Sequence, residues 1–477
     1  MPLNRPLFEQ RFAALRAVPG LDAATLDALA ATLRDPDDWA CFRLNPVSFA
    51  QAHGRAAHDV LDVFLHAARH GVLELRFNLV CPGCGAVEYQ VGRMDAVPSK
   101  DWHCIVCDRD VVADLDDRVE VSFTPEVGVR ALDLAPFTDV DRYWRFFYSA
   151  NFVRSPELTA FLKQLMVDLF LVAPGEDVTF TFEACEGRTF RVLSLDAHSQ
   201  AMMPTAPSGA AEVEVSCART GLAPASVPVR PGPVTVRLVN RGLEPVGAMA
   251  VHVDWDGLGA VLARAPNELR AFLTAKMLLN TQTFRDLFRA QQLDADMRLR
   301  VRSLTLLFTD LKGSTELYDR TGDLHAWQFV REHFRVLSDA VRRHRGAIIK
   351  TMGDAIMASF NEPTDAAQAA LEMMDGMRAL EARLEAEGHQ TGLKVGLHEG
   401  PALAVTAEER LDYFGQTVNV AARVQALAQA GEIWATPSVM DAPGVAPVLA
   451  QAGWRAELRE VSLKGVGGMT KVHRLAR

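Results

Sequence analysis

The chain has 477 residues, of which 49% are hydrophobic and 23% charged, a composition typical of a folded, multidomain protein rather than a disordered or fibrous one. Fifty basic and sixty acidic side chains give a net charge of −10, which opposes non-specific binding to nucleic acid or an anionic membrane. No apolar run is long enough to cross a bilayer, and the chain start lacks an apolar signal-peptide core, so we expect a cytoplasmic protein without a membrane partner. Seven cysteines are too few, and odd in number, for a disulfide framework.

The N-terminal part is expected to be helical and then β-rich. Residues 1–75 carry apolar side chains at helical spacing, interrupted by Asn45 and Pro46. A strand pattern, LELRFNLV, then leads into residues 76–130, where an alternating run, DRVEVSFTP, follows two Cys-x-x-Cys pairs. The order predicts a helical region, for which a winged-helix-like arrangement is one interpretation, followed by a zinc-ribbon-like element.

The middle of the chain, residues 131–265, is expected to combine helices with a β-sandwich-like region. Residues 137–173 show a helical pattern with an aromatic face, which we interpret as part of a core. From 176 to 256, short alternating runs are separated by Gly, Pro and Ser clusters and predict a β-sandwich or β-barrel. Two roles are open for this region: binding a small molecule or contacting another subunit.

Residues 266–301 are predicted to be a helical connector. The run from 267 to 300 keeps apolar side chains at helical spacing and ends directly before a strand pattern, SLTLLFTD. A helix in this place fits either of two roles, transmitting the state of the preceding regions or serving as a plain spacer.

Two carboxylates in the last region, residues 302–477, have the setting of metal ligands. The apolar run LTLLFTD places Asp310 at the end of a buried strand, before a turn that contains Gly, Ser and Thr. The pattern IIKTMGDAIMASF predicts a β-hairpin that presents Asp354 beside a glycine. Carboxylate oxygens are preferred ligands of Mg²⁺, so the pair predicts a site that holds divalent ions against a triphosphate.

A third motif, RLDYFGQTVNVAARVQALA, carries groups suited to a nucleotide. Asp412 precedes a glycine turn, after which a helix begins. Asn419 and Arg423 are four residues apart on that helix and therefore share one face. Arginine suits phosphate because its guanidinium is a fixed fork of donors that stays charged.

These three motifs, in this order, resemble the class III adenylate and guanylate cyclase family. The resemblance covers residues 302–477 and implies a ferredoxin-like α/β catalytic domain, which makes the whole chain a multidomain α+β protein. It implies that Asp310 and Asp354 hold two Mg²⁺ or Mn²⁺ ions, and that the backbone of Phe308 and Thr309 shapes the same cradle.

The resemblance also implies how the substrate is bound. Lys350 matches the adenine-reading lysine of the family and Asp412 its partner aspartate. A lysine can donate to N1 of adenine and a carboxylate can accept from its exocyclic amine, whereas guanine reverses this donor and acceptor pattern. By the same resemblance Asn419 orients the ribose, Arg423 stabilises charge on the α-phosphate and Lys464 meets the terminal phosphates.

The reaction implied is the conversion of ATP into 3′,5′-cyclic AMP and pyrophosphate. The 3′-oxygen attacks the α-phosphorus in line without a covalent intermediate, so catalysis rests on positioning and charge. In this family the metal-binding aspartates of one subunit face the base-reading residues of another, which implies an obligate homodimer. A cyclase for GTP or a pyrimidine nucleotide remains an alternative, because one lysine and one aspartate do not guarantee the base.

The cysteine pairs predict one structural Zn²⁺ per chain. Nineteen residues separate Cys84 from Cys104, a spacing typical of a site in which four thiolates, here Cys81, Cys84, Cys104 and Cys107, close a tetrahedron. Reduced free thiols and a redox switch are the alternatives.

A helical segment followed by a zinc ribbon also suggests a zinc-containing nucleic-acid sensor coupled to a cyclase. Residues 1–129 hold twelve Lys or Arg against nineteen Asp or Glu, which opposes this alternative. The layout resembles bacterial cyclases with a long N-terminal region that carries such CxxC pairs, a resemblance that names no ligand. We therefore expect no nucleic-acid partner, and an unidentified regulatory ligand or protein.

Overall fold

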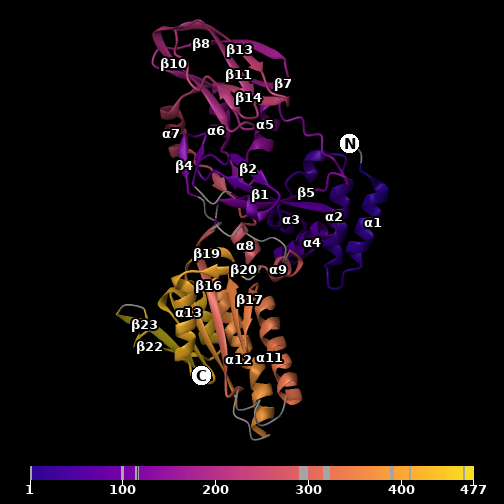
Figure 1. Cartoon of the computed structure of the whole chain (residues 1–477), viewed down its shortest axis with the longest axis vertical. Helices are drawn as coiled ribbons and strands as arrows, with labels where there is room; N and C mark the ends of the chain where they lie inside the picture. Colours follow the sequence, from indigo (N-terminus) through magenta and orange to yellow (C-terminus); the bar gives the residue numbers. More distant parts are fainter. Residues whose placement is uncertain are drawn as a thin grey trace.

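The chain forms an elongated molecule, with its N-terminal regions at one end and an α/β domain at the other (Figure 1). This computed structural model describes residues 3–97, 101–112, 115–116, 118–288, 299–314, 323–386, 391–407, 410–465 and 468–477. Among these residues, no helix combines the length and the apolar composition that a bilayer crossing requires.

Helices fill the first region, as the apolar spacing predicts. They are α1 (Arg5–Arg16), α2 (Ala23–Arg34), the short η1 (Asp38–Cys41), α3 (Pro46–His53) and α4 (Ala57–Arg69). Helix α2 begins where the Asp22 carboxylate accepts the N–H of Thr25 at 2.8 Å, a standard N-cap. Helix α3 ends at Gly54, whose left-handed backbone (φ 61°) suits a residue without Cβ. Phe8 and Phe64 are fully buried between the helices.

A small antiparallel sheet carries the cysteines. Its strands and short helix are β1 (Leu73–Val80), β2 (Val87–Val91), η2 (Met94–Ala96), β3 (Trp102–Cys104), β4 (Arg109–Val111) and β5 (Val119–Pro125). Strand β1 lies between β2 and β5, while β3 and β4 form a separate hairpin. Phe77 on β1 pairs in register with Val121, and both are buried against the helices.

The expectation of one helical stretch over residues 137–173 is wrong for its last part. The elements there are α5 (Val140–Phe147), β6 (Phe152–Val153), α6 (Pro156–Leu165) and β7 (Met166–Val172). Strand β7 pairs with β14, because a run rich in Val, Leu and Phe gains more from cross-strand pairing than from continuing the helix. Tyr143, Trp144 and Phe147 are buried, which confirms the interpretation of the aromatic face as core.

Two four-stranded sheets form the predicted sandwich, in the orders β10-β9-β14-β7 and β12-β11-β13-β8. The remaining elements are β8 (Asp177–Ala184), β9 (Thr189–Ser194), β10 (Ser199–Ala210), β11 (Glu212–Ala218), β12 (Gly221–Ala223), β13 (Gly232–Asn240), β14 (Val246–Val253) and the helix α7 (Trp255–Arg264). Val234, Val236 and Leu238 alternate into the core from β13. Strand β10 was not predicted, because its Pro and Gly residues mask the alternation.

The prediction of a long helix over residues 267–300 is wrong for residues 267–288 and for residues 299 and 300, which belong to a strand, and residues 289–298 lie outside the described part. The segment forms β15 (Glu268–Leu269), α8 (Ala275–Leu279) and α9 (Gln282–Leu287). Strand β15 pairs with β6, and Asn280 between the two helices turns its side chain to Ser359 of the C-terminal domain. These partners, distant in sequence, replace the helical hydrogen bonds that local spacing predicts.

The C-terminal α/β domain is built on one large sheet. Seven strands follow the order β17-β18-β16-β19-β21-β23-β22, with β20 paired to β19. Its elements are β16 (Leu299–Lys312), α11 (Asp323–Arg343), β17 (Ala347–Met352), β18 (Ala355–Phe360), α12 (Pro363–Ala386), β19 (Gly392–Ala407), β20 (Arg410–Phe414), α13 (Gln416–Leu427), β21 (Glu432–Ala435), α14 (Pro437–Met440), α15 (Val445–Gln451), β22 (Arg455–Ser462) and β23 (Met469–Ala476).

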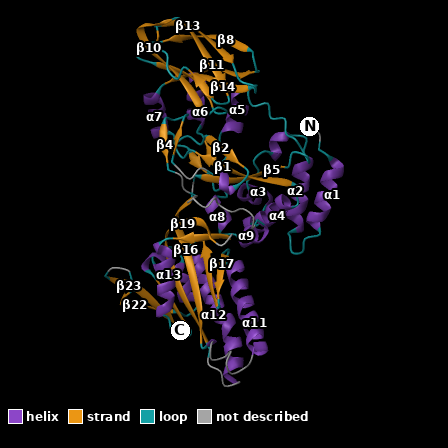
Figure 2. Cartoon of the chain, viewed as in Figure 1, coloured by secondary structure: helices purple, strands orange, loops and turns teal. Residues whose placement is uncertain are grey.

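The two faces of this sheet belong to different cores. On β16, Leu307 and Leu311 pack into the cluster that contains α11 and α12. Leu306 and Phe308 point the other way, into a cluster shared with the connector and the N-terminal helices. Figure 2 shows α8 and α9 between the N-terminal sheet and the strands of the C-terminal domain. One apolar core therefore runs from the N-terminal region into the C-terminal sheet.

Candidate active site

The predicted base-reading pair is formed within one chain. Lys350 lies on the edge strand β17 and Asp412 on β20, and the Lys350 Nζ donates to Asp412 Oδ2 at 2.6 Å. The other carboxylate oxygen of Asp412 accepts the N–H of Tyr413 at 2.7 Å. The lysine side chain remains 39% exposed, whereas that of Asp412 is 14% exposed, so the ammonium is the more accessible member of the pair.

The two predicted metal-binding carboxylates come to the same end of the sheet. Asp310 lies on β16 two residues beyond Phe308, which is paired with Met357 of β18, so it lies beside the turn that carries Asp354. The Thr309 hydroxyl accepts the N–H of Ile356 at 2.9 Å and ties the strand to the hairpin. Adjacent strands thus bring together carboxylates that are distant in sequence.

The two carboxylates differ in their partners. Asp310 forms an ion pair with Lys394, its neighbour in register on β19. One carboxylate oxygen of Asp354, Oδ2, is buried and has no hydrogen-bond partner within the described part of the chain. A buried, unpaired carboxylate oxygen is costly without a cation, so the donor set fits a divalent ion.

A histidine that sequence analysis did not single out supports the Asp354 turn. His333 of α11 is fully buried, and its Nε2 lies 2.9 Å from the backbone carbonyl oxygen of Asp354. Since a carbonyl can only accept, Nε2 carries the proton. Burial lowers the pKa of His333, so the ring is neutral near neutral pH. Only tertiary structure reveals this role, because the residue stands alone in a helical pattern.

The predicted phosphate-binding residues lie on and beside α13. Asn419 is exposed and Arg423 half-buried, one turn apart. Gly465 adjoins the guanidinium of Arg423, since a Cβ at this glycine would lie 3.1 Å from Nη2, and this contact places exposed Lys464 nearby. No hydrogen bond or ion pair joins these three cationic or amide groups to Asp310 or Asp354 among the described residues.

Two side chains of the connector form hydrogen bonds with the strands that carry Lys350 and Asp412. The Gln282 side chain accepts the N–H of Ile348, two residues before Lys350, at 2.8 Å. Arg285 donates to the carbonyl oxygen of Leu411, the residue before Asp412, at 2.8 Å.

Tyr413 completes this contact on the other side of Asp412. The guanidinium carbon of Arg285 lies 5.6 Å from the Tyr413 ring centroid, and the Tyr413 hydroxyl donates to Asn280 at 2.9 Å. Sequence analysis missed these connector residues, because no local pattern marks contacts to strands more than sixty residues away. The position of Lys350 and Asp412 therefore depends on residues that precede the C-terminal α/β domain.

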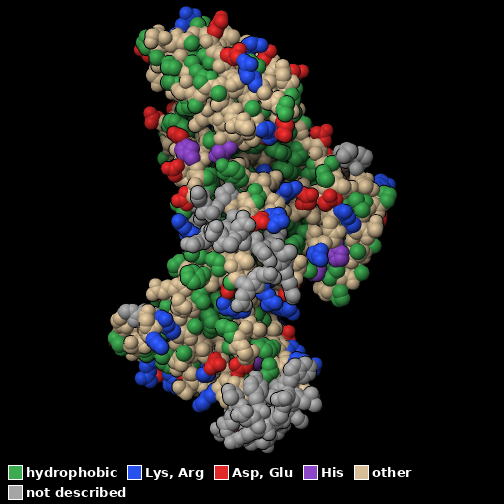
Figure 3. Space-filling model, in the orientation of Figure 1, with side chains coloured by type: hydrophobic (Ala, Val, Ile, Leu, Met, Phe, Trp, Pro, Cys, Tyr) green, Lys and Arg blue, Asp and Glu red, His purple; other side chains and the backbone are tan. Residues whose placement is uncertain are grey.

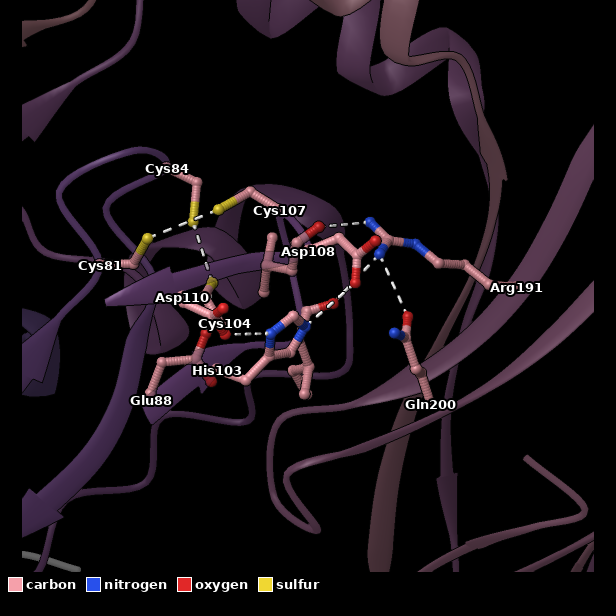
Figure 4. Close-up of polar contacts among 12 residues, drawn as sticks. Cys81, Cys84, Glu88, His103, Cys104, Cys107, Asp108, Asp110, Arg191 and Gln200 are labelled. Atoms are coloured by element: carbon pink, nitrogen blue, oxygen red, sulfur yellow. Dashed lines mark hydrogen bonds and ion pairs between the residues drawn. The ribbon is translucent and has the colours of Figure 1, made fainter. Parts of the chain in front are cut away.

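The four cysteines form a second candidate site, in the N-terminal region (Figure 4). Their sulfur atoms all lie within 4.8 Å of one another, and none of the four is in a disulfide. The Sγ atoms of Cys81 and Cys107 are 3.5 Å apart, and those of Cys84 and Cys104 are 3.7 Å apart. A ZnS₄ tetrahedron with bonds of about 2.3 Å has edges of about 3.8 Å, so the arrangement fits Zn²⁺.

Neighbouring side chains hold the second Cys-x-x-Cys loop, which runs from Cys104 to Cys107. Arg191 of β9 donates to the carbonyl oxygens of Ile105 and Val106, at 3.1 and 2.7 Å, between Cys104 and Cys107. Figure 4 shows the His103 ring turned to Asp108 and Asp110, each 3.0 Å away. The carboxylates of Asp110 and Asp108 accept hydrogen bonds from the imidazole and raise the pKa of His103, so both ring nitrogens are engaged away from the cysteines.

Comparison with known proteins identifies both halves of the chain. Residues 8–286 match a family of unknown function, DUF5939, and residues 298–473 match the adenylate and guanylate cyclase catalytic domain. Adenylate cyclase 2 of Rhizobium meliloti is 32% identical over 132 residues, which are 25% of this chain and 36% of that protein. The chain thus spans only part of this curated relative.

Two solved structures show the same similarity. The adenylyl cyclase CyaB from P. aeruginosa aligns with 38% of this chain and 96% of its own, at 21% identity and a TM-score of 0.32. An adenylate cyclase from Trypanosoma brucei, described in its monomeric state, aligns with 37% of this chain and 90% of its own, at 24% identity and a TM-score of 0.31.

Proposed function

Because this chain belongs to the DUF5939 family and carries a class III cyclase catalytic domain, we propose that it converts ATP into 3′,5′-cyclic AMP and pyrophosphate. The observation that carries the choice of base is the ion pair between Lys350 and Asp412. The pair offers a donor beside an acceptor, which is the complement of N1 and the exocyclic amine of adenine. Guanine presents a donor at N1 and an acceptor at O6, so it would leave both groups mismatched.

The remaining residues fit an in-line attack of the ribose 3′-oxygen on the α-phosphorus. Asn419 and Arg423 project from one face of α13, and we assign the ribose to the first and the charge on the α-phosphate to the second. Lys464 lies next to Gly465, which adjoins Arg423, and we assign it to the terminal phosphates. Asp310 and Asp354 would hold two Mg²⁺ or Mn²⁺ ions, which when bound offset phosphate charge and lower the pKa of the attacking hydroxyl.

A second copy of the chain is proposed to complete each site. The described carboxylates and Arg423 have no direct contact within one chain. Two apolar side chains beside the base-reading pair, Met352 and Phe414, are 41% and 68% exposed. Apolar side chains exposed beside catalytic groups favour a covering partner. We therefore assign the aspartates of one protomer and the base-reading pair of its partner to the same site.

The N-terminal region is proposed to carry one structural Zn²⁺ on its four cysteines and to regulate the cyclase without binding nucleic acid. On the face in Figure 3, Lys and Arg side chains over the N-terminal region are interspersed with Asp and Glu rather than gathered in a stripe. A mixed surface of this kind does not favour a polyanion.

The experiment that tests this function compares ATP, GTP, CTP and UTP as substrates. Purified full-length protein with Mg²⁺ or Mn²⁺ is incubated with each nucleotide, and cyclic products are quantified by mass spectrometry. We expect cyclic AMP to form, with kcat/KM for ATP at least about tenfold above that for GTP. A preference for another nucleotide would contradict the adenine assignment alone, and no cyclic product from any of the four would contradict the function.

A further inference from the structure

A cavity lies between the cysteine cluster and the base of the sandwich. Its volume is about 270 Å³, and its walls come from α5, α6, α7, β9, β14 and the two CxxC loops. Aliphatic side chains such as Leu158, Leu162 and Met249 form most of the wall, together with Trp144 and Trp255. A mostly apolar cavity with a few polar groups is the usual form of a small-molecule site.

Arg154 on this wall has no hydrogen-bond or ion-pair partner among the described residues. The guanidinium of Arg154 lies over two aromatic rings, 4.1 Å from the Tyr148 centroid and 5.0 Å from that of Trp144. Within the described part of the chain it has no hydrogen bond and no ion pair. Burial lowers the pKa of Arg154, yet an arginine stays charged in proteins. Its N–H donors therefore have no protein acceptor among the described residues.

Of the other polar groups on the wall, some already have hydrogen-bond partners and others do not. Arg191 is 7% exposed and binds the cysteine loop with both terminal nitrogens, so it belongs to the cluster. The carboxylate of Asp254 caps α7 by accepting the N–H of Gly257 at 2.8 Å.

Asn267 Oδ1 is buried without a donor among the described residues. Arg109 and His252 also line the cavity and form no hydrogen bond or ion pair among the described residues, and Arg109 is exposed. Arg154 is thus the less exposed of the two arginines without an ion pair, and Asn267 offers a neutral acceptor.

We propose that this cavity binds a small organic monoanion with an apolar body. Its anionic group pairs with Arg154, and its body packs between the aliphatic wall and the aromatic rings. The proposed cyclase reaction takes place in another domain, and the hydrogen bonds to the cysteine loop come from Arg191, so neither gives the Arg154 guanidinium a hydrogen-bond partner. A mostly apolar cavity with a partly buried arginine that has no ion pair selects for charge as well as shape, since a neutral ligand leaves the guanidinium without an anionic partner.

The test uses two fluorescent probes that differ by one charge. 8-Anilinonaphthalene-1-sulfonate is an anion, and N-phenyl-1-naphthylamine is its neutral analogue without the sulfonate. Each is titrated into full-length protein, the Arg154→Met variant, and a matched control, Arg264→Met. Arg264 lies on α7 outside the cavity wall and pairs with Glu157 at 2.7 Å.

We expect saturable binding of the sulfonate, with one site removed by Leu162→Trp, which fills the cavity from α6. Arg154→Met should weaken that site for the sulfonate at least about tenfold and for the neutral probe less than about twofold, because a charge-assisted hydrogen bond is lost only for the anion. The control should change neither. Unfolding midpoints and zinc content are measured for every variant.

Two results would overturn the proposal. Equal weakening of both probes by Arg154→Met would mean that the arginine shapes the cavity without selecting charge. A loss of zinc in that variant, with sulfonate binding unchanged, would assign Arg154 to the cysteine cluster as a counter-charge instead.

Discussion

The cysteine cluster and the aspartate pair are two candidate metal centres built in different ways. The four cysteine sulfurs already lie near the edges of a ZnS₄ tetrahedron. Of the aspartates, Asp310 forms an ion pair with Lys394, and one oxygen of Asp354 has no hydrogen-bond partner among the described residues. Four thiolates leave no coordination position for a substrate, whereas two carboxylates leave most positions for phosphate oxygens and water. The contrast indicates that the first centre supports structure and the second chemistry.

The largest effect on activity is expected when the aspartate pair or Arg423 is changed. Asp310→Ala and Arg423→Ala should each lower kcat by about a thousandfold or more, because each removes charge stabilisation of the transition state. Asp441→Ala and Arg459→Ala, at exposed positions outside the site, serve as matched controls and should retain activity. Initial rates of cyclic AMP formation at saturating ATP measure the change.

Mixing the two inactive variants tests whether the site is shared. In a random mixture half of the dimers pair one variant with the other, and one of their two sites is intact, so activity should return to about a quarter of the wild-type value. A mixture that stays inactive although heterodimers are detected would assign the aspartates and Arg423 to the same chain.

Substitutions in the cysteine cluster should lower the stability of the N-terminal region rather than change the catalytic step. Cys104→Ser removes one of four ligands, so zinc should fall from one equivalent per chain to less than about half, and the N-terminal region should lose about 3 kcal/mol or more of unfolding free energy. Cys185, exposed and outside the cluster, provides the control Cys185→Ser. Metal analysis together with denaturant unfolding would contradict a zinc site if both variants bind equally little metal.

A smaller effect concerns the choice of base. Asp412→Asn keeps the size of the side chain but adds donors, so it should lower the ratio of kcat/KM for ATP to that for GTP by about tenfold. Glu457→Gln, on an exposed strand, is the matched control. An unchanged ratio would remove Asp412 from base recognition even if overall activity fell.

The contact of the connector with β20 should have a weaker influence. Arg285→Met removes the hydrogen bond to Leu411 and the contact with Tyr413, so the KM for ATP should rise about three- to tenfold with a smaller change in kcat. Arg285→Lys should recover part of the loss, since it keeps a charged donor. A fall in kcat alone would place the effect elsewhere in the site.

The smallest expected effect is a dependence of stability on pH that arises in the C-terminal sheet and not at the cysteine cluster. Burial lowers the pKa of His398 to about 4, and its Nδ1 lies 2.8 Å from the Thr436 hydroxyl. Below the unfolded pKa of about 6.5 the unfolded chain binds the proton first, so stability falls as pH drops. Between pH 7 and pH 6 His398 should account for a loss of about 0.5–1 kcal/mol in unfolding free energy, measured by denaturant unfolding, in addition to the loss from the buried His333. His398→Gln should flatten this part of the profile while leaving the zinc content unchanged.

Local sequence patterns were sufficient to predict elements whose own alternation or turn residues determine their structure. Alternation predicted most strands of the sandwich, such as β13, and the glycine beside Asp354 predicted the hairpin that β17 and β18 form. Helical spacing gave the wrong prediction for β7 and for the connector, because strand pairing with β14 and with β6 determines the structure there. Helical periodicity measures which face is apolar and carries no information about distant partners.

By itself the sequence determined which chemistry is available: two carboxylates, a lysine and aspartate, an arginine on a helix face, and four paired cysteines. Only the tertiary structure decided which of these groups meet. It joined Lys350 to Asp412, brought Gln282 and Arg285 into contact with their strands, and left Arg154 on a cavity wall without an ion pair among the described residues. The physical reason is that side-chain chemistry is a property of each residue, whereas contact depends on sheet order and packing, which emerge only when the whole chain is folded.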